Sequence, residues 1–131
     1  MKTIRIPWPP GILNGHAKGH WRKRAKATKD QRTAAFWAAK AAGVTTDPNA
    51  VLRFTYHPPD RRRRDVQNMP GALKAAVDGI ADAMGVDDNG FRPQFPDRFG
   101  EPVPDGVVIV EVLDQSELKY RAAAYERELP W

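Results

Sequence analysis

The sequence predicts a single α/β domain of the α+β type, in which a small sheet packs with two main helices. Its 131 residues suit one domain and leave little length for a second. Short segments rich in β-branched residues alternate with two segments that have helical composition or helical spacing. The resulting order along the chain is strand, helix, strand, helix and then further strands.

The first strand is expected over Thr3–Pro7, because Thr-Ile-Arg-Ile alternates polar and apolar residues before a proline-rich stop. Residues 11–19 read as a loop. A long helix rich in Ala, Lys and Arg is expected from His20 or Trp21 to Ala42, and Gly43 is a plausible stop. We expect Trp37 in the core, beside a buried stripe of alanines. That stripe comprises Ala27, Ala34, Ala35, Ala38 and Ala42.

A second strand is expected over Val51–Tyr56. Asn68 is expected to cap one continuous helix that ends near Met84, with Pro70 in its first turn and Gly85 after its end. Residues at 3.6-residue spacing are expected to face the core from this helix. They are Leu73, Ala76, Val77, Ile80 and Met84.

The remaining strands are of unequal quality. The segment Phe91–Phe95 reads as a poor strand and is expected to open a hairpin within residues 91–101. The segment Val107–Leu113 gives the strongest strand signal of the chain. The predicted domain therefore covers residues 1–114, and residues 115–131 form a C-terminal helix or tail.

Composition excludes several classes of protein. There is no cysteine, which excludes disulfides and thiolate metal sites and agrees with a reducing, cytoplasmic location. The first ten residues carry prolines and too short an apolar run for a signal peptide. No segment approaches the roughly 20 apolar residues of a membrane span.

Charge is divided unevenly along the chain. Residues 1–64 hold 15 Lys and Arg against 3 Asp and Glu, a net charge of +12. Residues 65–131 hold 6 Lys and Arg against 13 Asp and Glu, a net charge of −7. This asymmetry suggests a face that binds polyanions beside an acidic feature. A solvated basic surface with no partner is the alternative.

The start of the first helix is strongly basic. Its cations are Lys18, Arg22, Lys23, Lys26 and Lys29. Exposed cations at a helix N-terminus oppose the helix dipole at a cost of about 0.3–1 kcal/mol each. Phosphates would neutralise such a cluster, although a merely solvated helix end explains it as well.

The most informative segment is the run of four arginines that ends at Asp65. Arginine forms forked hydrogen bonds to phosphate oxygens, so four in a row suit a site that several phosphates approach. The positive field keeps an adjacent carboxylate ionised, as a Mg²⁺ ligand must be. Asp87 and Asp88 follow beyond the predicted helix. Asp65 and Asp88 converge only if the sheet brings both helix ends together. Otherwise Asp65 is a helix cap and Asp87-Asp88 an ordinary turn.

These segments resemble the RusA family of Holliday-junction resolvases. The opening Ile6-Pro7-Trp8-Pro9-Pro10, with Asn14 in the following loop, looks like the end of the family's first strand. Residues 61–88 resemble its central signature, in which an Arg-rich run precedes Asp-x-Asp-Asn, a lysine four residues before an aspartate, and Asp-Asp. The resemblance implies a homodimer with a mixed sheet. It also implies paired nicking of four-way DNA junctions with Mg²⁺, or Mn²⁺ in its place.

Site residues follow from the resemblance one by one. Asp65 and Asp88 fall on catalytic, metal-binding aspartates, and Lys74 on a helix lysine that contacts the scissile phosphate. Asp87 is a further candidate ligand. Gln67 stands where the family has its second aspartate, and glutamine offers a neutral carbonyl oxygen but no charge. Asp78 or Asp87 compensates, the enzyme is slower or prefers Mn²⁺, or activity is lost.

The expected DNA contacts lie on the basic loop and on the first helix. They are Arg61, Arg62, Arg63, Arg64, Lys18, Arg22, Lys23 and Lys26, with His16 and Asn14. Trp8 and Trp21 are candidates for stacking on bases at a branch point, although burial of Trp8 is the stronger expectation. The predicted function is a nuclease that resolves branched DNA in recombination and repair. The alternative is a protein that binds branched DNA without cutting it, because Gln67 replaces an aspartate.

Overall fold

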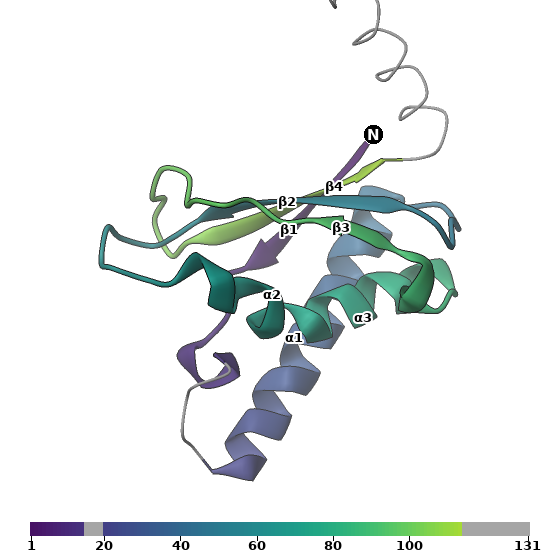
Figure 1. The fold of residues 1–131 in the computed structure, drawn as a ribbon. Helices are drawn as coiled ribbons and strands as arrows, with labels where there is room; N and C mark the ends of the chain where they lie inside the picture. The colour runs from purple at the N-terminus through teal and green to yellow at the C-terminus, as the bar shows by residue number, and fades with distance from the viewer. Residues whose placement is uncertain (15–19, 114–131) are drawn as a thin grey trace, which may run out of the picture.

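Four strands form one mixed sheet in the order β1-β4-β2-β3. The computed structural model describes residues 1–14 and 20–113, and Figure 1 shows their arrangement. The strands are β1 (Lys2–Pro7), β2 (Val51–His57), β3 (Arg92–Gln94) and β4 (Val107–Leu113). The α-helices are α1 (Trp21–Ala42), α2 (Met69–Ala72) and α3 (Lys74–Met84), and short 3₁₀ turns are η1 (Gly11–Leu13), η2 (Val66–Asn68) and η3 (Asp88–Gly90).

The helices cover one face of this sheet (Figure 1), which gives an α+β domain of two layers. The inner face of the sheet is apolar at alternate positions, as the strand period requires. It comprises Ile4 and Ile6 of β1, Val108, Val110 and Val112 of β4, and Leu52, Phe54 and Tyr56 of β2. These side chains form one core with α1 and α3. The predicted fold class is therefore confirmed at the level of a single mixed-sheet domain packed with helices.

The predicted hairpin after Phe91 is wrong. Strand β4 pairs antiparallel with both β1 and β2, whereas β3 pairs in parallel with β2 over Val51–Arg53. The approach to β3 is fixed by the buried side chain of Phe91 and by the bond that the Arg92 N–H donates to the Ala50 carbonyl. Pro93 has no N–H to donate, which suits this short edge strand.

Helix α1 has the predicted bounds, and Gly43 ends it in the left-handed conformation at φ 74°. The predicted buried face is wrong in part. The buried residues are Gln31, Ala35 and Ala39, at a spacing of four, and Trp37 is 64% exposed. Trp37 lies two residues beyond Ala35, about 200° around the helix, and so faces away from the core. The other predicted alanines, Ala27, Ala34, Ala38 and Ala42, are half-buried.

The predicted continuous helix over residues 68–84 is interrupted at Leu73, where φ is −108° and ψ is 6°. The amide of the buried Gln31 side chain lies in this break. Its Nε2 donates to the Ala72 carbonyl oxygen at 2.8 Å, and its Oε1 accepts from the Ala76 N–H at 3.0 Å. In a regular helix these two backbone groups would bond to each other. The side-chain amide therefore replaces one backbone hydrogen bond with two.

The predicted Asn68 cap is also wrong, because the Asn68 side chain forms no capping hydrogen bond. Asp65 performs that role one turn earlier, at the start of η2. The expected core residues of this region are buried, except Val77, which is half-buried.

Within the described residues, 1–14 and 20–113, no helix is long and apolar enough to cross a membrane. The predicted C-terminal helix or tail lies outside the described residues.

Candidate nucleic-acid interface

The four arginines of the loop between β2 and η2 differ in exposure and in their bonding partners. Arg64 is the most enclosed, with its side chain 14% exposed. It forms a 2.9 Å ion pair with Asp60 and donates to the carbonyl oxygens of Asp60 and Arg62. The pKa of Asp60 is lowered by the Arg62 N–H bond to its carboxylate and by Arg64. Arg64 therefore holds the loop in its conformation. No signal in the sequence distinguished Arg64 from the other three arginines.

Arg61, Arg62 and Arg63 are exposed. Arg61 pairs with Glu101 at 2.8 Å, which draws it toward the loop before β4. Arg62 and Arg63 form no ion pair with the described part of the chain. An external anion that approaches their guanidinium groups therefore has no carboxylate of the described residues to displace.

A hollow of about 570 Å³ lies beside this loop, and we call it the arginine hollow. Its polar lining comes from Arg62, Arg63, Arg64, Asp65, Asn68, Asn14 and Asp105, and its remaining lining from residues 8–11, Pro59, Met69 and Ala72. Trp8 is half-buried, packs against Phe99 and receives the Arg64 guanidinium at 5.7 Å from its ring centroid. The predicted DNA residue Asn14 and three of the four arginines therefore share one concave surface.

Asp65 is the N-cap of η2, where its Oδ1 accepts a hydrogen bond from the Gln67 N–H at 2.9 Å. The cap therefore uses one carboxylate oxygen, on a side chain that is exposed in the arginine hollow. Gln67 itself is exposed, and its backbone N–H rather than its side chain meets Asp65. The cap interpretation of Asp65 is thus confirmed, while its role as a metal ligand remains a prediction.

Lys74, Asp78 and Asp88 form a second polar cluster. The Lys74 ammonium bonds to Asp78 at 3.0 Å, one turn along α3, and also to Asp88 in η3 beyond the end of α3. Both aspartate side chains are half-buried, at 26% and 31% exposed. The hydrogen bond from Lys74 lowers the pKa of Asp88, and the same bond is the main cause that raises the pKa of Lys74. Asp88 is therefore ionised at neutral pH.

Asp87 lies next to this cluster but has a different partner. Its Oδ1 accepts from the Asn89 N–H at 2.9 Å, so it caps η3 as Asp65 caps η2. The turn interpretation of Asp87 is confirmed, whereas Asp88 reaches back to Lys74.

Two smaller hollows connect these parts. One, of about 250 Å³, is lined by Arg24 and Thr28 of α1, Lys74 and Asp78 of α3, and Ala72, which also lines the arginine hollow. The other, of about 190 Å³, is lined by Lys74 and Asp88 together with Phe91 and Phe95. Three hollows therefore follow one another from the arginine loop past Lys74 to Asp88, and α2 with the start of α3 forms their common wall.

The donor set suits a hydrated divalent cation in one respect. Mg²⁺ takes one or two carboxylates and keeps several waters, and Asp78 and Asp88 offer two carboxylates that water reaches. Lys74 already holds a positive charge between them, so an ion would share their oxygens with the ammonium. Within residues 1–14 and 20–113, no three or more His, Cys, Asp or Glu side chains form a group that could hold a metal ion.

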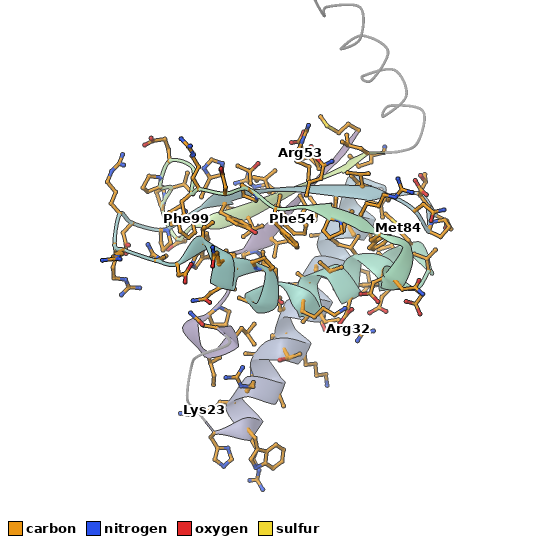
Figure 2. All side chains as sticks on the ribbon, viewed as in Figure 1. Lys23, Arg32, Arg53, Phe54, Met84 and Phe99 are labelled. Carbon is orange, nitrogen blue, oxygen red and sulfur yellow. The ribbon has the colours of Figure 1, made fainter. Side chains whose placement is uncertain are left out.

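The first turns of α1 carry the expected cations. Arg22, Lys23 and Lys26 are exposed, and Lys26 pairs with Asp30 at 2.6 Å. Figure 2 labels Lys23 on the part of α1 that extends beyond the sheet. His20 caps the helix, since its Nδ1 accepts from the Arg22 N–H. The predicted contacts His16 and Lys18 lie outside the described residues.

Two residues near these hollows were not singled out from the sequence. Gln31 holds the break before Lys74, and Arg24 lines the hollow that contains Lys74 and Asp78. Gln31 does share the four-residue spacing of Ala35 and Ala39, which is a signal that it faces the core. Nothing in the sequence indicates that its amide would bond to residues 72 and 76.

No protein-family model matches the chain. The chain is similar to an uncharacterized protein of Xylella fastidiosa (strain Temecula1 / ATCC 700964), with 36% identity over 96 residues. The matched region covers 70% of this chain and 63% of the Xylella protein, so this chain spans less than two thirds of that relative.

Proposed function

We propose that this protein is a structure-selective endonuclease of the RusA type, which cuts four-way or otherwise branched DNA as a homodimer with Mg²⁺. The observation that carries the proposal is the Lys74 ammonium bonded to both Asp78 and Asp88, one hollow away from the arginine-rich loop. Carboxylates that can hold a divalent cation, close to arginines that can hold phosphates, suit metal-assisted phosphodiester hydrolysis.

The proposed roles of the residues follow from their positions. Arg62 and Arg63 would hold backbone phosphates by forked hydrogen bonds, and Arg64 would keep their loop in shape. Lys74, 63% exposed, would contact the phosphate that is cut. Asp65, Asp78, Asp87 and Asp88 are the candidate ligands. Mg²⁺ held by such carboxylates would stabilise charge on the phosphate and lower the pKa of a bound water.

The test is cleavage of a labelled synthetic four-way junction beside a linear duplex of the same sequence, with Mg²⁺, Mn²⁺ or EDTA. We expect metal-dependent, symmetry-related nicks in the junction alone. Asp88→Asn and Asp65→Asn should each lower the rate at least about a hundredfold, which corresponds to roughly 3 kcal/mol of lost transition-state stabilisation.

Asp47→Asn is the matched control for Asp65→Asn. The Asp47 carboxylate accepts from the Asn49 N–H at 3.0 Å, the same type of turn cap that Asp65 makes with Gln67, and Asp47 lines none of the three hollows. Full cleavage is expected for this control. Equal rates for Asp65→Asn and Asp47→Asn would contradict a catalytic role for Asp65.

A second candidate function is binding of branched DNA without cutting. Gln67 favours it, because an exposed amide stands where the family has an aspartate, and no cluster of three metal ligands forms within the described residues. Gln67→Asp discriminates between the two. A large gain of cleavage would identify a weakened metal site, and junction binding with no cleavage in either metal by either form would favour the binding protein.

A further inference from the structure

Residues 20–29, which we call the α1 tip, expose a tryptophan in a basic setting. Trp21 is 69% exposed, and the buried residues of α1 begin only at Gln31. The tip is about 15 Å long at the usual rise per residue. Figure 1 shows this end of α1 extending away from the sheet and from α3. A large aromatic side chain in this position adds little to the core, so folding does not explain it.

The partners of the indole leave it available to a flat ligand. The His20 ring stacks beside it, with centroids 5.9 Å apart and planes 22° apart. The Arg22 guanidinium lies 5.3 Å from its ring centroid, within the range of a cation–π contact. These contacts restrict the indole, while more than two thirds of the residue stays open to solvent.

The charge of the tip favours an anionic ligand. It carries Arg22, Lys23, Arg24, Lys26 and Lys29 and no acidic residue. All five are exposed except the half-buried Arg24. The first acidic side chain of α1 is Asp30, which is already paired with Lys26. The apolar neighbours of Trp21 on the tip are only Ala25 and Ala27, so the tip lacks the continuous apolar face with which a helix enters a membrane surface.

The tip leads directly to the candidate site. Arg24 and Thr28 line the same hollow as Lys74 and Asp78. A DNA strand whose backbone crosses this hollow would therefore have the α1 tip, with its indole, on one side of the phosphate at Lys74.

We propose that Trp21 is a stacking platform for an unpaired base of DNA, held while the basic side chains of the α1 tip bind the neighbouring phosphates. The inference rests on the proposed function, since it identifies an unstacked base near a branch or single-stranded end as the part of the substrate recognised. An intact duplex hides the faces of its bases, so Trp21 would discriminate in favour of branched or single-stranded DNA.

The test measures DNA binding in EDTA, so that cleavage plays no part. The probes are a labelled single strand, an abasic strand of equal length and the four-way junction, and the readout is fluorescence anisotropy. Trp21→Ala should weaken binding of the single strand by about 5- to 150-fold, the range that base–aromatic stacking supports, and leave the abasic strand unchanged. Trp21→Phe should retain most of the affinity because it keeps an aromatic face.

Trp37→Ala is the matched control, since Trp37 is 64% exposed on the same helix, near its other end. It should bind all probes as the wild type does. Equal loss on the base-bearing and abasic strands would overturn stacking in favour of a purely electrostatic contact. Unchanged affinity of Trp21→Ala for all three probes would also overturn the stacking site.

Junction cleavage with Mg²⁺, measured separately, distinguishes this inference from the proposed function. If the junction is not cut but Trp21→Ala loses affinity for the base-bearing strand, the stacking site stands and the nuclease does not. If the junction is cut and Trp21→Ala binds every probe like the wild type, the stacking site is refuted and the proposed nuclease function stands.

Discussion

Lys74 donates to two aspartates that come from different parts of the chain, Asp78 on its own helix and Asp88 beyond it. The bond to Lys74 lowers the pKa of Asp88, so this pairing is complete above the usual aspartate range and is lost as the pH falls through the lowered value. At neutral pH both partners are charged. The proposed phosphate contact of Lys74 would therefore need no prior proton transfer to this pair.

At the break where α3 begins, the Gln31 side chain bonds to the backbone on both sides. Gln31→Leu keeps a side chain of similar size but leaves the Ala72 carbonyl and the Ala76 N–H without their bonds to the amide. Both groups lie in a buried setting, so we expect a loss of about 2–4 kcal/mol in the free energy of unfolding. Urea denaturation followed by circular dichroism measures it.

Thr33→Ala, at an exposed site on the same helix, is the control and should change stability by less than about 0.5 kcal/mol. A comparably small loss for Gln31→Leu would mean that α2 and α3 join by the direct backbone bond. The break at Leu73 would then not depend on Gln31.

At the scale of elements, α1 and α3 approach each other closely because small residues line both helices. An added Cβ at Gly79 would lie 2.2 Å from the Arg32 carbonyl oxygen and 3.0 Å from the Ala35 Cβ. Arg32 of α1 also forms a bidentate ion pair with Asp82 of α3. Its Nε donates to Oδ2 at 2.6 Å and its Nη2 to Oδ1 at 2.9 Å. This packing fixes the distance of α3, and with it Lys74, from α1.

Gly79→Ala should therefore destabilise the protein by about 1–3 kcal/mol, because backbone of α1 has to move. Gly71→Ala is the matched control, since a Cβ there meets nothing within 4 Å and alanine favours a helix. It should be neutral or stabilise by up to about 1 kcal/mol. Thermal unfolding of the two variants measures the difference, and similar melting temperatures would show that the α1–α3 contact can widen without cost.

At the scale of the whole molecule, the basic residues of the first half meet the acidic residues of the second around α2 and α3. Arg62 and Arg63 lie on one side of this boundary and Asp78 and Asp88 on the other, with hollows that share Ala72 and Lys74 between them. A polyanion bound along these hollows would release counterions as it meets each arginine, so its affinity should fall steeply with salt.

Replacing both Arg62 and Arg63 by Ala should lower the slope of log affinity against log salt for junction DNA by about 2, because each phosphate contact contributes about 0.9. Replacing Arg5 and Arg53 by Ala is the control with the same change in charge. Both arginines lie on the face of the sheet opposite to the helices, in register with Ile109 and Glu111. The control should keep the slope, and equal slopes for the two double variants would contradict a phosphate role for the arginine loop.

The sequence alone determined the single domain, the bounds of α1 and β4, and the positions of β1 and β2 to within a residue. These features depend on local composition, on alternation and on a glycine such as Gly43 that ends a helix. It also determined which segment carries the arginines and aspartates, because such residue types appear in the sequence without any knowledge of the fold.

Only the tertiary structure decided what those residues meet. The parallel pairing of β3, the exposure of Trp37 and the break at Leu73 each depend on contacts between segments distant in the sequence, such as Gln31 with residues 72 and 76. Asp88 pairs with Lys74 because η3 returns along α3, whereas Asp65 stays at its own cap in the arginine hollow. Local spacing fixes the elements, but the packing of α3 beside α1 and the return of the chain through η3 decide which charges become neighbours.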